Sequence, residues 1–301
     1  MKVLNFHKLT IDDREAVQAV TLKAGHRNCN FTFANLVGWQ FWFQTEVCIL
    51  NDAVILRYNF HGQRAYMICM PGAPSCEMIK LLSDDCGDNL TLLGLEDEWA
   101  QQLKRNACHK GIDITITPLR NQYDYIYLRS NLESLSGGKL KAKRNHVNKF
   151  ISEYPDFEYK ELTPDLFDQC RKVVDKWQHS KEHDNPDYAQ TIEAEQQVME
   201  NIFHHWERLD MIGGALFVSN KMVAFTYGSK VTDDTIDVCV EKADTEIDGV
   251  YSVINQQFAA HLPESIIYIN REEDMGLPGL RKAKLSYHPE ILLSFNAVHI
   301  A

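Results

Sequence analysis

The second half of the chain carries an ordered series of strand-like and helix-like patterns that few folds can accommodate. Phe157–Leu162 alternates as a strand does, and Thr163 followed by Pro164 marks the start of a helix. A second helical pattern and a hairpin turning at Asn220 and Lys221 follow, and then a third alternating strand. Later elements are predicted near residues 248–262, 266–269, 278–285 and 290–296. The predicted order is strand, two helices, three antiparallel strands, helix, strand, helix, strand.

The first half repeats this order with one change. Val3–Phe6 is predicted to be a strand, and the helix after it ends at Gly25. An aromatic segment, Phe31–Phe43, stands where the second helix would be, and strands near 112–117 and 124–128 close the unit. We therefore predict two units, at residues 1–133 and 155–301. A basic segment at 134–154 joins them and is expected to form part of a crevice between them.

This order of elements resembles the GNAT acyltransferase fold. The resemblance implies an α/β (α+β) protein made of two tandem GNAT acyltransferase-like domains, each with a mixed, mostly antiparallel sheet.

Composition limits the partners of such a protein. The 301 residues include 31 Lys and Arg and 42 Asp and Glu, which gives a net charge of −11. Such a surface repels phosphate backbones over most of its area, so we expect no DNA binding. No apolar stretch reaches the ~20 residues of a membrane span, and the first residues contain no apolar signal core. These features predict a cytoplasmic protein without a transmembrane segment. The eight cysteines form no CxxC pair, which predicts buried free thiols and no metal site.

A basic segment interrupts this acidic chain. Five Lys or Arg and no acid lie between Glu133 and Glu153. If the segment is helical, Lys143 falls on the same face as Val147 and Phe150. A lysine there either meets an anion or lays its stem along the core with its ammonium in water. We take Lys143, Arg144 and Asn145 as candidate binding residues.

A second charged segment, Asn270–Pro289, leaves a predicted buried strand. Three acids, Glu272, Glu273 and Asp274, are followed by glycines and a basic helix. Ligands of open sheets gather beyond strand ends, and acids beside bases could supply a proton acceptor next to an anion holder. A charged surface turn with local ion pairs is the alternative. The candidate binding residues here are Asn270, Arg271, Gly276, Gly279, Arg281, Lys282 and Lys284.

Three segments resemble motifs of the DUF2156 family: Asn30–Leu36 with Trp39 after it, Gly137–Phe150, and Asn270–Pro289. That family is grouped with the C-terminal domain of phosphatidylglycerol lysyltransferases. The resemblance spans essentially the whole chain and implies tandem GNAT-like domains, as in transferases that use aminoacyl-tRNA. It implies no particular substrate.

The chain departs from related patterns in two places. Acetyl-CoA-dependent GNAT proteins carry a glycine-rich phosphate loop, whereas residues 241–250 here contain one glycine and four acids, which would repel a pyrophosphate. We therefore expect no conventional CoA binding, and the acyl donor is unknown. The chain also lacks the membrane region of a lipid lysyltransferase.

These features predict an acyl or aminoacyl transferase acting on an amine or hydroxyl. Glu272 or Asp274 would accept the proton, and Tyr287 would relay it or donate a hydrogen bond. Lys143, Arg144, Arg281 and Lys284 would hold an anionic small-molecule or aminoacyl donor. Any contact with tRNA would be weak and confined to the acceptor end, through Lys139, Lys141 and Lys149. The alternative function is a non-catalytic protein of this fold that binds an anionic small molecule.

Overall fold

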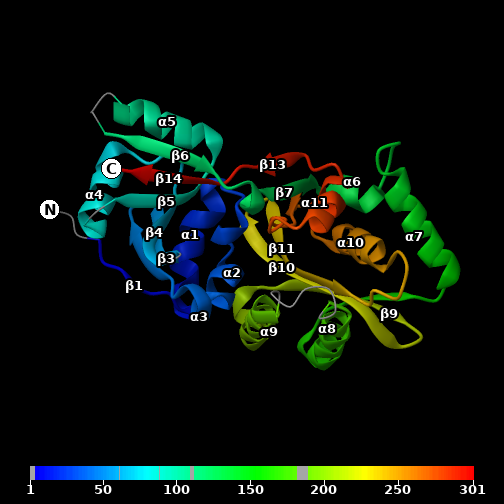
Figure 1. The fold of residues 1–301 in the computed structure, drawn as a ribbon. Helices are drawn as coiled ribbons and strands as arrows, with labels where there is room; N and C mark the ends of the chain where they lie inside the picture. The colour runs from blue at the N-terminus through cyan, green and yellow to red at the C-terminus, as the bar shows by residue number, and fades with distance from the viewer. Residues whose placement is uncertain (1–3, 61, 88, 109–111, 182–188) are drawn as a thin grey trace.

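The structure, a computed structural model, describes residues 4–60, 62–87, 89–108, 112–181 and 189–301. It contains two seven-stranded sheets placed side by side, with helices between and around them (Figure 1). The predicted class, α/β with mixed and mostly antiparallel sheets, is confirmed.

The first sheet is covered on both faces. One face packs against α4 (Cys76–Cys86) and α5 (Asp97–Cys108). The other face packs against α1 (Arg14–Ala24), α2 (Phe33–Gly38) and α3 (Gln40–Phe43). In spatial order its strands are β1 (His7–Lys8), β2 (Glu46–Leu50), β3 (Ala53–Phe60), β4 (Gln63–Cys69), β5 (Leu90–Leu95), β14 (Asn296–Ile300) and β6 (Ile114–Pro118).

The second sheet belongs to the unit whose pattern is clearest in the sequence. Its strands are, in spatial order, β13 (Ile291–Leu293), β7 (Asp124–Leu128), β12 (Tyr268–Asn270), β11 (Thr235–Ala243), β10 (Lys221–Thr232), β9 (Ile212–Val218) and β8 (Glu158–Glu161). The helices of this unit are α6 (Arg129–Ser134), α7 (Lys141–Glu153), α8 (Phe167–Lys181), α9 (Ala189–His204), α10 (Val250–His261) and α11 (Pro278–Leu285). From β8 to β13 the predicted GNAT-like order of elements is confirmed.

One apolar core joins the two units. It runs from Leu56 and Met67 of the first sheet, past Val17 of α1, to Phe225 and Tyr227 of the second sheet. Helices α6, α7 and α10 cover the opposite face of the second sheet with a separate core. The two units therefore pack against each other through α1 and α2, which lie between the two sheets in Figure 1.

Several local signals act as predicted. Gly25 ends α1 in the left-handed conformation with φ 77°. Pro164 begins a 3-10 turn (Pro164–Leu166) that leads into α8. The first strand lies at His7–Lys8, later than the predicted Val3–Phe6, part of which lies outside the described residues.

One predicted strand joins the other sheet, and one strand was not predicted. We predicted that β7 closes the first unit, but it lies between β13 and β12 of the second sheet. The last strand, β14, follows the final strand that we predicted and lies between β5 and β6 of the first sheet, where Val298 pairs with Leu92 and Ile116. Alternation of side chains predicts that a segment is a strand but says nothing about which sheet it joins. The boundaries at residues 133 and 155 stay a prediction, but neither sheet is built from one contiguous half.

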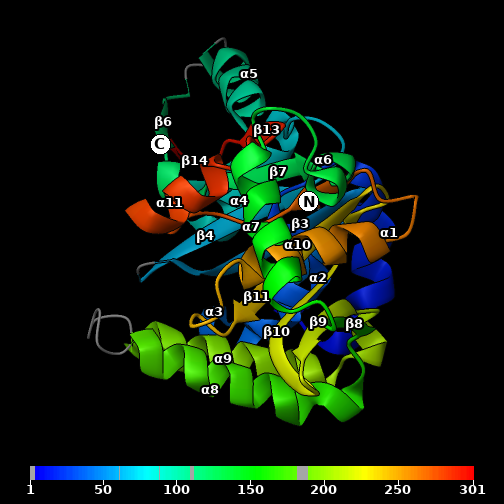
Figure 2. The same ribbon diagram turned by 90° about the vertical axis from the view of Figure 1, so that its right-hand side faces the viewer.

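The basic segment is also placed differently from our expectation. Val147 and Phe150 of α7 pack against Val250 and Ile254 of the second unit. In Figures 1 and 2, α7 lies at the end of the second unit that is farthest from the first sheet. The segment therefore does not line a crevice between the units, because its apolar face is taken up by α10.

Candidate functional site

The predicted acidic segment leaves the second sheet at a point where two strands separate. β12 runs parallel to β11 and pairs with it over only three positions, from Thr235 with Tyr268 to Asp237 with Asn270. β11 continues to Ala243, whereas the chain after Asn270 turns away as a loop that leads to α11. Ligand sites in open sheets gather at such strand ends. The residues of this loop meet residues from both units.

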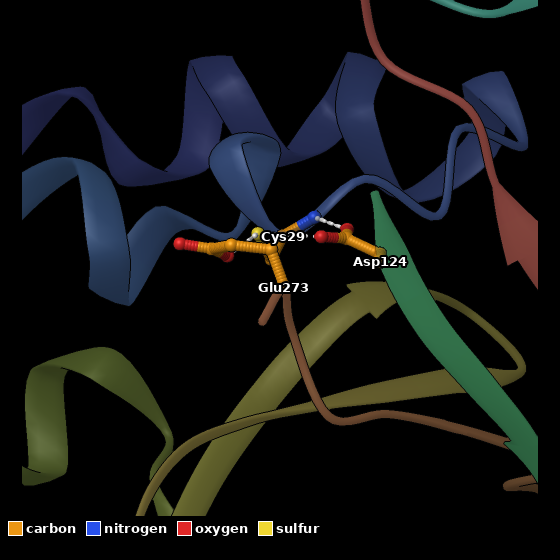
Figure 3. A group of neighbouring side chains, drawn as sticks. All are labelled: Cys29, Asp124 and Glu273. Atoms are coloured by element: carbon orange, nitrogen blue, oxygen red, sulfur yellow. Dashed lines mark hydrogen bonds between the residues drawn. The ribbon is translucent and has the colours of Figure 1, made fainter. Parts of the chain in front are cut away.

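Four carboxyl groups and two thiols gather around this loop. We call this group the acid cluster; its members are Cys29, Asp124, Asp237, Cys239, Glu272 and Glu273. Cys29 comes from the first unit, Asp124 from the start of β7, and Glu273 from the loop, and the three side chains converge in Figure 3. The backbone N–H and the thiol of Cys29 donate to the two carboxylate oxygens of Asp124 at 2.8 and 3.3 Å. The site therefore depends on both units.

Asn35 of α2 joins the other carboxyl groups of the cluster. Its side-chain Nδ2 donates to Asp237 Oδ2 at 3.0 Å and to Glu272 Oε1 at 2.9 Å. Asp237 is fully buried, and its second oxygen, Oδ1, has no hydrogen-bond partner among the described residues. Asn270 adds a bond from its Nδ2 to Asp124 Oδ2 at 2.8 Å. Oδ1 of Asp237 is itself buried, and the side chain of Thr32 acts on the same carboxyl group to lower its pKa.

Burial and mutual repulsion govern the charges of this cluster. Burial, and then the nearby charge of Glu273, raise the pKa of Asp124 to about 6. Burial, with the charges of Asp124 and Glu273, raises the pKa of Asp237 well above the usual range. Burial, with the charges of Asp237 and Glu273, does the same for the pKa of Glu272. The nearest cation is Lys284, whose ammonium donates to the backbone oxygens of Arg271 and Glu273. The cluster thus favours protons, or a positively charged ligand, over the bare carboxylates.

Either of two trios has donor atoms close enough to hold a metal. Sγ of Cys239 and one oxygen each of Asp237 and Glu272 lie within 4.8 Å of one another, as do the corresponding atoms of Cys29, Asp124 and Glu273. Thiolate and carboxylate are zinc ligands. The sequence-based expectation of no metal site stays a prediction.

Asp274, two residues after Glu272, has a different environment. It accepts two bonds from Arg281 at 2.8 Å, and bonds from Arg120 at 3.1 Å and Tyr125 at 2.6 Å. Burial alone would raise the pKa of Asp274, but these hydrogen bonds hold it well below its usual range. Of the two predicted bases, only Glu272 has a raised pKa, which is the direction that a general base needs. Arg281, a predicted binding residue, forms its ion pair with Asp274.

Three predicted residues from the two charged segments come together on the other face of the second sheet. Lys143 Nζ lies 4.1 Å from the centroid of the Tyr287 ring, and the Arg271 guanidinium lies 5.0 Å from that centroid. Arg271 also pairs with Glu241 at 2.8 Å, while its buried Nη1 has no partner in the described part of the chain. Burial, and then the neighbouring Arg271, lower the pKa of Lys143. We call Lys143, Arg271 and Tyr287 the basic cluster.

The remaining predicted residues lie outside both clusters. Arg144 donates to the backbone oxygens of Leu135 at 2.5 Å and Gly137 at 3.2 Å, so it holds the loop before α7. Gly276 has φ 77° and lies against Asn121, where a Cβ would come within 2.9 Å of the amide. Asn145, Gly279 and Lys282 are exposed.

Sequence reasoning missed Cys29, Asn35, Asp124, Asp237 and Cys239. Asp237 alternates with Ile236 and Val238, so the sequence pattern places it on the other face of the strand and does not indicate that it is buried. Asn35 lay within a segment that we used only for the family resemblance. No signal in the sequence linked it to Asp237.

Two units with this element order, meeting around a buried acid cluster, define a tandem GNAT-like protein. The chain matches the family "Phosphatidylglycerol lysyltransferase, C-terminal" over residues 23–298, and it belongs to that family. The predicted resemblance is thereby confirmed.

Solved structures and a sequence relative agree with this assignment. A conserved protein of unknown function from Bacteroides thetaiotaomicron is 37% identical, with a TM-score of 0.91, over 99% of this chain and 100% of that one. The C-terminal domain (DUF2156) of an Agrobacterium fabrum protein assigned as a lysylphosphatidylglycerol synthetase has the same fold, with 13% identity and a TM-score of 0.59 over 95% and 92% of the two chains. An uncharacterised protein of Mycoplasmoides gallisepticum is 24% identical over 212 residues, which are 68% of this chain and 62% of that protein.

None of the helices in the described ranges combines the length and the apolar character that crossing a membrane requires.

Proposed function

We propose that this protein transfers an acyl or aminoacyl group to an amine, with Glu272 as the general base. The observation that carries the proposal is a pair of carboxyl groups, the buried Asp237 and the half-buried Glu272, held together by the amide of Asn35. A pKa raised by burial suits a group that must both take and return a proton near neutral pH. The family of the chain, whose description is a lysyltransferase, supports the same class of reaction.

In this mechanism the acceptor binds as an ammonium ion beside Asp237 and Glu272. Glu272 takes one proton from the ammonium, and the neutral nitrogen attacks the acyl carbonyl carbon. A C–N bond forms while the bond from that carbon to the donor's leaving oxygen or sulfur breaks. The proton held by Glu272 then passes to the leaving group, which restores the carboxylate.

The basic cluster would hold the anionic part of the donor. Lys143, which is half-buried, and Arg271, whose Nη1 is buried, provide positive charge where a charge-assisted hydrogen bond is strong. Tyr287 lies under both cations, and its hydroxyl donates to Ser252 Oγ at 3.3 Å. We therefore propose that Tyr287 positions Lys143 and does not itself relay a proton.

The connection between β11 and α10 supports a donor other than CoA. Two of its acids are paired: Asp244 with Lys176 at 2.7 Å and Asp248 with Lys149 at 2.6 Å. Gly249 has φ 78°, and a Cβ there would lie 2.6 Å from the backbone oxygen of His146. The glycine thus allows α7 to approach closely, which is a packing role and not a phosphate-binding one.

A transfer assay tests the proposal. Unfractionated tRNA charged with radiolabelled lysine is mixed with the protein and a panel of small amines and hydroxyl compounds, with acetyl-CoA as a second donor. We expect labelled product from charged tRNA, and Glu272→Gln should lower its rate by about 100-fold or more. The matched control is Glu264→Gln, which changes an exposed carboxyl group and should leave the rate unchanged.

The outcomes separate the two candidate functions. Donor binding without product in the wild-type protein would overturn the transferase proposal in favour of a non-catalytic binding protein. Product formed by Glu272→Gln at the wild-type rate would instead remove Glu272 from the base role.

Contact with tRNA is proposed at the exposed lysines of the α7 region. Lys139, Lys141 and Lys149 are exposed. We expect weak, steeply salt-dependent binding of charged tRNA, and replacement of all three by Gln should abolish it at moderate salt. Filter binding at two salt concentrations measures this. Undetectable binding of the wild-type protein at low salt would point to a small anionic donor.

A further inference from the structure

The first unit contains a cavity that the acid cluster and the basic cluster do not use. Its volume is about 400 Å³, within the range of sites for small molecules. Leu56 of β3, Met67 of β4 and Leu93 of β5 form its floor, and Leu36 and Phe43 from α2 and α3 line the helical side. Phe295, just before β14, also lines it. The walls thus offer apolar contact from several elements.

A positive charge lies beside this apolar space. Arg120, in the turn after β6, contributes to the lining, and its side chain is 35% exposed. It shares one carboxylate, that of Asp274, with Arg281. Two guanidinium groups and one carboxylate leave a net charge of +1. Asp274 is already bonded by Arg281, Tyr125 and the backbone N–H of Gly276, so it cannot offset both cations.

Arg120 has hydrogen-bonding capacity left for a ligand. One of its terminal nitrogens donates to Asp274 at 3.1 Å and the other to the Tyr125 hydroxyl at 2.9 Å. A guanidinium carries five N–H groups in a planar fork that suits a carboxylate. Asp274 is also its only acidic partner in the ion pairs found among the described residues.

We propose that this cavity binds a small monocarboxylate with an apolar body. The apolar body occupies the space between the first sheet and α2–α3, and the carboxylate meets Arg120 at the edge. This inference goes beyond the proposed function, because it requires no transfer reaction and uses none of the residues of the acid cluster.

Calorimetric titration of the intact protein with straight-chain carboxylates of increasing length tests the proposal. Each added methylene group should strengthen binding by about fourfold until the cavity is full. The carboxylate of a given length should bind about tenfold more tightly than the matching alcohol, because its hydrogen bond to Arg120 is charge-assisted. The matching amine should bind least.

Variants locate the site. Leu56→Trp should abolish binding of the acids and the alcohols alike by filling the cavity. If Leu56→Trp does not fold, the smaller change Leu36→Phe takes its place and should weaken binding. The control for the added ring is Ile267→Trp at a half-exposed side chain outside the cavity, which should bind as the wild-type protein does. Arg120→Gln should remove the preference for acid over alcohol and leave the alcohol affinity unchanged.

The proposal is overturned if no member of the series binds, or if binding survives both filling substitutions. Equal affinity for acid and amine would overturn the role of Arg120. If the transfer assay gives no product but the carboxylates still bind, only the proposed function is overturned.

Discussion

Glu272 and Asp274 lie two residues apart in one loop, yet their surroundings act on them in opposite directions. Asp274 is fully buried and receives bonds from two arginines, a tyrosine and a backbone N–H, which hold its pKa low. Burial, and then the charges of Asp237 and Glu273, raise the pKa of Glu272, which receives one side-chain bond, from Asn35. Desolvation thus raises the pKa of both groups, and only at Asp274 do fixed donors reverse it and keep the carboxyl group charged.

Because their surroundings differ, the two carboxyl groups have different roles. A carboxylate that is permanently charged and fully hydrogen-bonded holds elements together: Asp274 links the turn at Arg120 to α11 through Arg281. A carboxyl group with few partners and a raised pKa can exchange a proton or meet a cation. We infer that the loop combines a structural acid with a chemically available one.

The largest expected effect is a difference in stability between variants of these two acids. Asp274→Asn leaves two arginines without their counter-charge and should lower the free energy of unfolding by about 3–5 kcal/mol. Glu272→Gln removes a repelled charge and should change stability by about 1 kcal/mol or less. Urea denaturation at pH 7 measures both. Equal losses at the two positions would show that the comparison is wrong.

A smaller effect concerns pH. The pKa of Asp124 is about 6 in the folded protein and about 3.9 for an unperturbed aspartate. The folded state therefore binds more protons in this window, so stability is lost as pH rises from about 4 to 6. The asparagine in Asp124→Asn cannot titrate. Across this pH range the free energy of unfolding of the wild-type protein should therefore fall by about 1–3 kcal/mol relative to that of the variant.

Urea midpoints at several pH values between 4.5 and 7.5 provide the measurement. The control is Glu264→Gln, whose carboxyl group is exposed and should follow the wild-type curve. Parallel curves for Asp124→Asn and the wild-type protein would mean that Asp124 has an ordinary pKa in the folded state.

The features of the fold and site that could be predicted from the sequence depend on local signals. Gly25 and Pro164 mark helix ends because their backbone preferences act within a few residues. The alternation of the second half predicted its order of elements. The charge pattern singled out the two charged segments, and the structure brings Lys143 of one beside Arg271 and Tyr287 of the other.

The part that the sequence could not predict depends on contacts between distant residues. Asn35 bonds Asp237 across 202 positions of sequence, and Cys29 bonds Asp124 across 95. No periodicity reports such a contact. The same limit applies in part to Asp274: its partner Arg281 is only seven residues away, but Arg120 and Tyr125 lie 154 and 149 residues away.

The smallest expected effect compares two neighbouring cations, Lys143 and Arg144. Lys143 lies beside Arg271, and burial together with that like charge lowers its pKa, so Lys143→Met should change stability by about 0.5 kcal/mol or less. Arg144 donates to two backbone oxygens, and Arg144→Met should cost about 1 kcal/mol for the lost hydrogen bonds. Urea denaturation of both variants at pH 7 gives the difference. A loss at Lys143 as large as that at Asp274 would mean that this lysine is held by a fixed partner. In that case the basic cluster would resemble the Asp274 group, with its charge committed to the fold and unavailable to an anionic donor.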